Sequence, residues 1–210
     1  VLPAHVHLPL QSGSDRILRL MLRRYRRDDY LERARALMSA RPGFTLSTDL
    51  IVGFPGETED DFQATLELVR EVGFSAVFAF KYSPRPHTPA LRLGDDVSEE
   101  LKTERLARLF ELVDELQSKH LNSLVGTRSE VLIEGPSKTN AARWTGRSER
   151  HDIVHVDLPD GHDLSGQLVP VRIIEANKRS LLATPIGSLP APVRSAARRR
   201  PQLCLPLMTT

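Results

Sequence analysis

The chain has 210 residues, of which 40% are hydrophobic and 27% are charged, and its net charge is +2. These values are typical of one large or two small globular domains. The sequence contains no run of about 18 uncharged apolar residues, so no membrane span is predicted. Binding of nucleic acid cannot rest on so small a net charge and would need a local basic patch.

The ends of the chain and its single cysteine limit what it can do. The start, VLPAHVHLPL, has no Met and no basic segment leading into an apolar one, so we expect a fragment without a secretion signal, whose N-terminal part is missing. Cys204 cannot form an internal disulfide and cannot alone hold an iron–sulfur cluster, which usually takes several thiolates.

Helical and extended patterns alternate over the first 120 residues. Ser14 and Thr58 are expected N-caps, and Asp61 completes an approximate capping box with Thr58. The LIV run at 50–52 is apolar on both faces, as in a buried parallel strand. The succession predicts a parallel α/β sheet with right-handed crossovers. The predicted strands are 5–10, 44–54 and 75–83, and the predicted helices are 15–24, 28–38, 59–72 and 98–121.

The pattern changes after Gly126. SEVLIEG, DIVHVDL, QLVPVRIIEA and RSLLATP read as short strands separated by turns, which predicts a small all-β module of about 60 residues. The segment 186–210 is rich in Pro, Ala and Arg without periodicity, and we expect it to be disordered.

The stretch LIVGFPGE, 50–57, places two glycines and a proline after a predicted strand. Ligands of parallel sheets lie beyond the carboxyl ends of the strands, and glycine allows the backbone to approach them. Glu57 could cap the following helix or accept hydrogen bonds from an amine or a hydroxyl. Equally, the stretch could be a tight turn with an acid in the first turn of a helix.

Three segments, HLPLQSGSDRILRLM, YLERARALMSARPGFTLSTDLIVGFPGETEDDFQATLELV and FAFKYSPRPHTPA, resemble the methylthiotransferases of the radical S-adenosylmethionine superfamily. The resemblance covers residues 5–183. It implies an α/β fold, the C-terminal part of a partial radical-SAM (β/α) barrel, at 1–120. An all-β, OB-like TRAM module that binds RNA follows at 121–185, and a tail follows at 186–210.

The resemblance also implies site residues. Arg23 matches a Met-x-Arg-x-Tyr pattern and suits the carboxylate of the cofactor's methionine; the alternative is a solvated arginine. The remaining cofactor-binding candidates are Gln11, Ser12, Asp49, Ile51, Gly53 and Glu57. The RNA-binding candidates are Arg85, Lys138, Arg143, Trp144 and Arg147.

Four further residues leave questions open. Trp144 could instead belong to the core of the β module. His5 and His7 have a spacing that could hold a metal, but we expect satisfied strand histidines, so no metal ligand is assigned. The family usually has Gly where His87 stands, which puts the loop around His87 in question.

The implied reaction adds a methylthio group to a modified adenosine beside the tRNA anticodon, with S-adenosylmethionine and two 4Fe–4S clusters. The family's Cys-x-x-x-Cys-x-x-Cys ligands lie upstream of this segment, so we expect residues 1–210 alone to be inactive. The implied partners are tRNA and an electron-donor protein, with no membrane, in the cytoplasm. Alternatives are the sibling enzymes that act on threonylcarbamoyladenosine in tRNA or on a ribosomal-protein aspartate, and a non-catalytic RNA-binding remnant.

Overall fold

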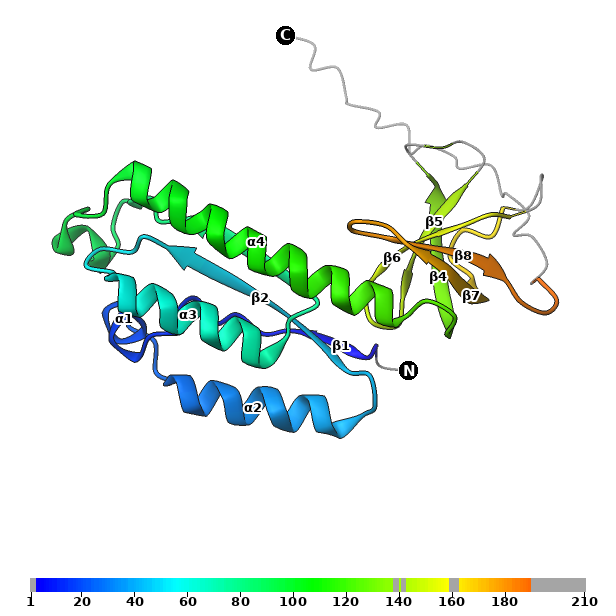
Figure 1. Cartoon of the computed structure of the whole chain (residues 1–210), viewed down its shortest axis with the longest axis horizontal. Coiled ribbons are helices and arrows are strands. Elements are labelled where there is room, and N and C mark those ends of the chain that lie inside the picture. The colour runs from blue at the N-terminus through cyan, green and yellow to red at the C-terminus, as the bar shows by residue number, and fades with distance from the viewer. Residues whose placement is uncertain (1–2, 138–139, 141–142, 159–162, 190–210) are drawn as a thin grey trace, which may run out of the picture.

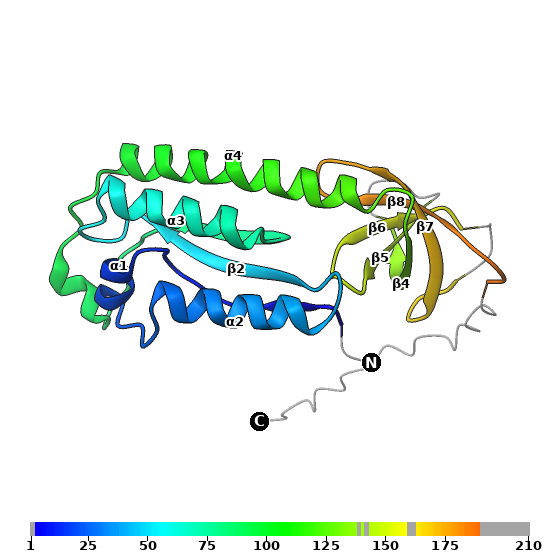
Figure 2. The same cartoon turned by 60° about the horizontal axis from the view of Figure 1, so that its bottom comes forward.

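The computed structural model describes residues 3–137, 140, 143–158 and 163–189. An α/β unit comes first and a β-barrel second, and the long helix α4 runs along the unit and ends at the barrel (Figures 1 and 2). The helices are α1 (Asp15–Leu20), α2 (Arg27–Ala40), α3 (Glu59–Val72) and α4 (Glu99–Ser123), with the 3-10 helix η1 (Pro89–Leu93). The strands are β1 (His5–His7), β2 (Thr45–Val52), β3 (Ala76–Lys81), β4 (Arg128–Pro136), β5 (Trp144–Ser148), β6 (Ile153–Val156), β7 (Leu168–Ala176) and β8 (Leu181–Pro185).

The predicted parallel sheet is confirmed, with the strand order β1-β2-β3. One face carries Leu46, Leu50 and Val52, which pack in one core with side chains of α2, α3 and α4. On the other face Phe78 is 53% exposed and Phe80 is 58% exposed. The prediction that the LIV run is buried on both faces is therefore wrong, because Ile51 lies on this open face and is only half-buried.

Capping side chains set the helix starts as predicted. Ser14 accepts a hydrogen bond from the Ile17 amide, and Thr58 forms a reciprocal capping box with Asp61. The first helix is shorter than predicted and ends at Leu20, because Leu22 turns into the left-handed region with φ 58°. Helix α3 ends at Gly73, which also has a left-handed backbone.

Asp61 joins the two turns that bring α1 and α3 together. Its carboxylate accepts from the Ser14 hydroxyl (2.6 Å), from the Thr58 amide (2.9 Å) and from the Arg16 guanidinium. Burial alone would raise the Asp61 pKa, but the hydrogen bonds from Arg16, Ser14 and Thr58 outweigh it and hold the pKa well below its ordinary range.

We expect this lowered pKa to make stability depend on acid pH. A lowered folded-state pKa stabilises above the unfolded value of about 4, and that stabilisation is lost as the pH falls toward the folded value. Urea unfolding should show a loss of about 2 kcal/mol between pH 5 and pH 2 that Asp61→Asn largely removes. An Asp61→Asn variant with the same acid slope as the parent would contradict this role.

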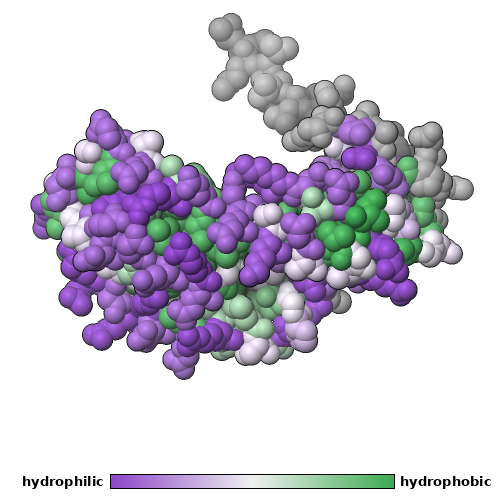
Figure 3. All heavy atoms as spheres, in the orientation of Figure 1, coloured by the Kyte–Doolittle hydropathy of each residue, from purple (hydrophilic) through white to green (hydrophobic). Residues whose placement is uncertain are grey.

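The all-β module is also confirmed. Five strands form a closed barrel in the order β4-β5-β6-β8-β7, with an apolar interior that includes Val131, Ile133 and Val169. A patch of hydrophobic residues is visible on the barrel in Figure 3, while hydrophilic residues dominate the same face of the α/β unit. Most of the predicted disordered tail, residues 190–210, lies outside the described residues.

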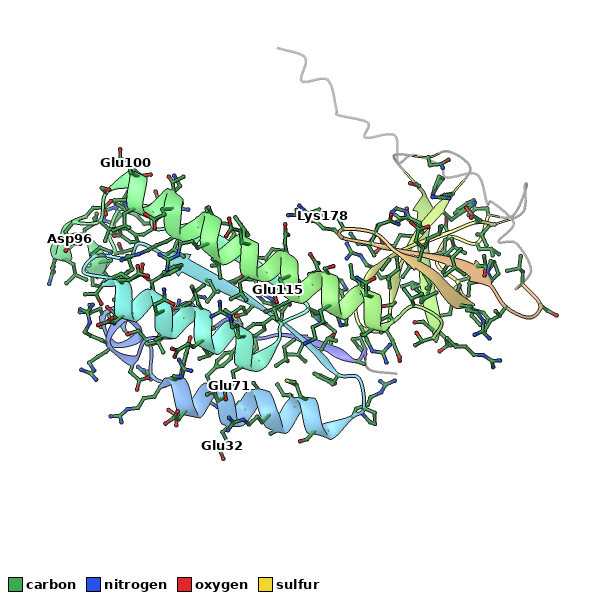
Figure 4. The ribbon with its side chains drawn as sticks, viewed as in Figure 1. Glu32, Glu71, Asp96, Glu100, Glu115 and Lys178 are labelled. Carbon is green, nitrogen blue, oxygen red and sulfur yellow. The ribbon has the colours of Figure 1, made fainter. Side chains whose placement is uncertain are left out.

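Two turns of the barrel contact the α/β unit. The turn after β5 lies against the start of the sheet, where the Ala4 amide donates to the Glu149 carbonyl (2.8 Å) and Arg150 Nε donates to the Gly43 carbonyl (2.8 Å). The β7–β8 turn reaches α4, where Lys178 pairs with Asp114 (2.9 Å; Lys178 is labelled in Figure 4). No helix among the described residues is long and apolar enough to cross a membrane.

Candidate functional site

A cavity of about 470 Å³ opens where the carboxyl ends of β2 and β3 meet the Gln11 turn and the segment after α1. We call it the strand-end cavity. It lies where the ligands of parallel sheets bind. Four predicted cofactor-binding residues line it, which are Gln11, Arg23, Asp49 and Ile51, together with the predicted RNA-binding residue Arg85.

The polar groups of the strand-end cavity differ in charge. The guanidinium of Arg23 is exposed and makes no hydrogen bond or ion pair within the described part of the chain. Asp49 supplies a carboxylate on the open face of the sheet, 3.3 Å from His7 Nε2. A guanidinium suits a carboxylate and a carboxylate suits an amine or hydroxyl, so the cavity can hold a ligand that carries both.

Apolar side chains form much of the remaining wall. Met21, Phe54, Phe80 and Tyr82 line the cavity, and the rings of Phe54 and Tyr82 meet edge to face at 5.1 Å. Apolar and aromatic walls with a few polar groups are typical of cofactor sites. Phe54, Phe80 and Tyr82 were not among the predicted site residues, although their position at the strand ends was a signal for them.

The opening turn does not bring Glu57 to this cavity. The Glu57 side chain is buried and accepts hydrogen bonds from the Gly53 amide (2.7 Å) and from Arg105 Nη1 (2.9 Å). Burial raises the Glu57 pKa, and the Gly53 amide and Arg105 only partly oppose that rise. Glu57 therefore ties the turn to α4, and this tight-turn interpretation is the one that the contacts favour.

Gly53 and Ser12 also have contacts inside the protein. Gly53 has φ 69°, and a Cβ there would lie 2.3 Å from Lys102 Cγ. The glycine therefore makes room for a buried lysine of α4. Ser12 is fully buried, and its hydroxyl accepts from the Ser14 amide (3.2 Å) and lies 3.4 Å from the Thr65 hydroxyl.

The backbone of the loop after β3 has an unusual conformation at position 87. His87 has φ 64°, in the left-handed region where glycine has no steric penalty. That conformation accounts for the glycine that the family usually has there. His87 adopts this left-handed conformation in the present chain. The hydroxyl of the next residue, Thr88, donates a hydrogen bond to the Arg85 carbonyl (2.8 Å), and Thr88 is the N-cap of the short helix η1.

The predicted RNA-binding residues of the barrel are only partly brought together. Arg143 and Arg147 lie on β5 or just before it; Arg143 Nε pairs with Asp157 (2.9 Å) and Arg147 Nη1 donates to the His151 carbonyl (3.1 Å). Trp144 is half-buried and packs against the barrel core, as the alternative interpretation had it. Lys138 lies outside the described residues.

A second cavity of about 790 Å³ separates the barrel from the open face of the sheet. We call it the interdomain trough. Arg147, Arg150 and Arg179 line its barrel side, and Phe78 lines its sheet side. Asp49 and Phe80 belong to the walls of both cavities, so the trough and the strand-end cavity adjoin each other.

The described residues contain no set of side chains that could bind a metal ion. No group of three His, Cys, Asp or Glu side chains in the described part could hold a metal ion. His5 and His7 are satisfied as expected, because their ring nitrogens lie 2.9–3.3 Å from Thr45, Ser47 and Asp49. The described donor set therefore does not fit an iron–sulfur cluster.

Comparisons with known proteins agree with this architecture. Residues 2–69 match the Radical SAM superfamily and residues 122–186 match the TRAM domain. Residues 2–69 of the α/β unit are therefore a radical SAM segment, and the barrel is a TRAM domain. The chain thus joins a part of the radical S-adenosylmethionine superfamily to a TRAM domain.

Several similar proteins are named tRNA-2-methylthio-N(6)-dimethylallyladenosine synthase. The one from Sorangium cellulosum is 59% identical over 206 residues, which is 95% of this chain and 41% of that protein. Those from Akkermansia muciniphila and Nitratidesulfovibrio vulgaris are 46% and 47% identical over 185 and 186 residues, covering 88% and 87% of this chain and 40% and 41% of those proteins. The chain thus spans about two fifths of the length of these curated relatives.

Proposed function

We propose that the protein carrying this chain is a tRNA methylthiotransferase that modifies an N6-dimethylallyl adenosine beside the anticodon, in the cytoplasm. The observation that carries the proposal is the strand-end cavity, where the Asp49 carboxylate and the Arg23 guanidinium, which has no partner among the described residues, face an apolar and aromatic wall. The substrate comes from the names of the relatives. An electron-donor protein completes the proposed set of partners.

S-adenosylmethionine fits the residues of the strand-end cavity. Arg23 would hold the methionine carboxylate bidentately, and Ile51 would pack on the adenine. Asp49 would accept hydrogen bonds from amine or ribose groups, and the Gln11 amide could accept or donate them. When bound, this cofactor supplies the radical chemistry of the family. The residues of this chain orient it and exclude water on its apolar side.

The proposal includes two 4Fe–4S clusters, as the family has. Because the described residues offer no cluster ligands, we derive no step through a cluster. The TRAM domain supports a role in tRNA binding, with Arg143, Trp144 and Arg147 on the barrel and Arg85 at the strand-end cavity as candidate contacts. The position of Arg147 on the trough, which adjoins the strand-end cavity, supports this role.

Arg23→Ala in the complete protein should weaken S-adenosylmethionine binding at least about tenfold, because it removes a charge-assisted hydrogen-bond pair. Isothermal titration calorimetry measures this affinity. Arg24→Ala is the matched control, since Arg24 is an exposed neighbour that does not line the cavity, and it should change the affinity less than about twofold.

Product analysis tests the reaction itself. The complete, cluster-loaded protein should add a methylthio group to tRNA that carries dimethylallyl adenosine and not to tRNA that carries threonylcarbamoyladenosine. Equal loss of affinity in Arg23→Ala and Arg24→Ala would remove the cofactor assignment, and activity on the second tRNA alone would replace the substrate.

A further inference from the structure

Five side chains form a continuous ladder of polar contacts along the open face of the sheet. His5 lies between two hydroxyls of β2, with Nδ1 3.0 Å from Thr45 Oγ1 and Nε2 3.0 Å from Ser47 Oγ. His7 continues the row, with Nδ1 2.9 Å from the same Ser47 Oγ and Nε2 3.3 Å from Asp49 Oδ2. The order Thr45, His5, Ser47, His7, Asp49 follows from the parallel register of β1 and β2.

The two ends of this ladder lie in different parts of the molecule. Asp49 lines the strand-end cavity. At the other end, Thr45 Oγ1 is 3.2 Å from the Arg150 carbonyl of the barrel and 3.3 Å from the Ala4 carbonyl. The His5 ring also stacks on His151 of the same barrel turn, with centroids 5.3 Å apart. The ladder therefore connects the cavity to the seam between sheet and barrel.

Asp49 sets the direction of every hydrogen bond in the ladder when the imidazoles are neutral. A carboxylate only accepts, so His7 must carry its proton on Nε2, and its bare Nδ1 accepts from the Ser47 hydroxyl. Ser47 then accepts from His5 Nε2, and the bare His5 Nδ1 accepts from the Thr45 hydroxyl. Thr45 has a single proton, so in this state it cannot donate to the Arg150 carbonyl.

Freeing His7 from Asp49 permits the reverse direction. His7 then donates from Nδ1 to Ser47, Ser47 donates to His5 Nε2, and His5 donates from Nδ1 to Thr45. The Thr45 hydroxyl is released and has two carbonyl acceptors, that of Arg150 in the barrel (3.2 Å) and that of Ala4 beside the sheet (3.3 Å). When the hydroxyl donates to the nearer of the two, the Arg150 carbonyl, the reversed ladder adds one hydrogen bond across the seam.

We propose that the ladder couples the strand-end cavity to the docking of the barrel: a ligand that engages Asp49 reverses the ladder and tightens the seam at Thr45. The inference rests on the proposed function in one respect, which is that S-adenosylmethionine is that ligand. The other four members of the ladder are then positioning residues, because they act on the ligand only through Asp49 and on the seam through the contact with the barrel. They are Thr45, His5, Ser47 and His7.

Nitrogen NMR of histidine-labelled protein measures the ladder without any ligand. At pH 8, where an ordinary imidazole is neutral, His5 and His7 should both carry the proton on Nε2. In Asp49→Ala, His5 should shift to the Nδ1–H form. Asp60→Ala, which removes an exposed acid of α3, should leave both tautomers unchanged. His5 already in the Nδ1–H form in the parent, or unchanged in Asp49→Ala, would overturn the proposal.

Hydrogen exchange measures the effect on the seam. The Ala4 amide donates to the Glu149 carbonyl of the barrel, so its exchange reports on docking. Asp49→Ala should slow this exchange about fivefold, the effect of one ordinary hydrogen bond. In the double variant Asp49→Ala, Thr45→Val the slowing should disappear; the same slowing in the double variant would show that Thr45 does not transmit it and would overturn the proposal.

The ligand is tested in the complete protein by measuring tRNA affinity with and without S-adenosylmethionine. We expect the cofactor to change tRNA affinity about fivefold in the parent and by less than about twofold in Ser47→Ala, which interrupts the ladder. Cofactor and tRNA binding without coupling, or with equal coupling in Ser47→Ala, overturns the inference alone. Absence of cofactor binding overturns the proposed function, and the histidine tautomers still decide the ladder.

Discussion

Arg105→Met should destabilise the chain by about 3–5 kcal/mol, because it leaves the Glu57 carboxylate buried without its counter-charge. The two side chains are 2.9 Å apart, and both are almost fully buried between the turn after β2 and α4. Arg105 also donates to the Glu57 carbonyl (3.0 Å), so the variant loses a second bond. Chemical denaturation at pH 8 measures the loss.

The pH dependence distinguishes a buried charge from lost packing. Burial already raises the Glu57 pKa, and removing Arg105 should raise it further. A carboxyl group whose pKa is raised in the folded state contributes most to stability at low pH, and this contribution is lost as the pH rises through the folded-state pKa. The destabilisation caused by Arg105→Met should therefore be smaller at pH 5 than at pH 8. The double variant Glu57→Gln, Arg105→Met should recover part of the loss. A defect independent of pH and additive with Glu57→Gln would exclude the buried-charge explanation.

Gly13→Ala should destabilise the chain by roughly 3 kcal/mol through a steric overlap that no side-chain movement can relieve. A Cβ at Gly13 would lie 2.5 Å from both the Ala64 carbonyl oxygen and the Thr65 Cα, which are backbone atoms of α3. The Gly13 amide also donates to the Thr65 hydroxyl (2.9 Å), so the turn cannot move away without losing this bond.

A second glycine supplies the control for this variant. Gly73 has φ 67°, and a Cβ there meets nothing within 4 Å. Gly73→Ala therefore adds backbone strain without overlap and should cost about 1 kcal/mol. Comparing the thermal unfolding of the two variants separates the cost of steric overlap at Gly13 from the cost of backbone strain at Gly73. Equal losses of stability would mean that the contact between Gly13 and α3 is not tight.

The element order was predictable from the sequence because its signals are local. Apolar periodicity and the caps Ser14 and Thr58 placed the helices, and the change of pattern after Gly126 placed the barrel. The end of α1 was missed, because nothing in Leu22 announces a left-handed backbone. The open face of the sheet was missed because the apolar run at 50–52 does not tell whether helices cover one face of the sheet or both.

The candidate site was predictable where it depends on strand ends and not where it depends on partners distant in sequence. Gln11, Asp49 and Ile51, which the resemblance implies, line the strand-end cavity and agree with the rule that parallel strands place ligands at their carboxyl ends. Glu57 and Gly53 looked equally exposed to a ligand, but Arg105 and Lys102 of α4 occupy their surroundings. Only the packed structure brings these residues of α4 beside the turn, since about 50 residues separate the two segments.

The contact between Thr45 and Arg150 has a consequence for how the chain folds during synthesis. The contact joins residues 105 positions apart, and the barrel turn is made long after the sheet edge that it covers. At ordinary translation rates of about 5–20 residues per second, the edge at Ala4 and Thr45 waits for roughly 5–20 s before its partner emerges. During that interval His5 of β1 lacks the barrel turn that contacts it in the folded chain, so the sheet edge is open to water and to other proteins.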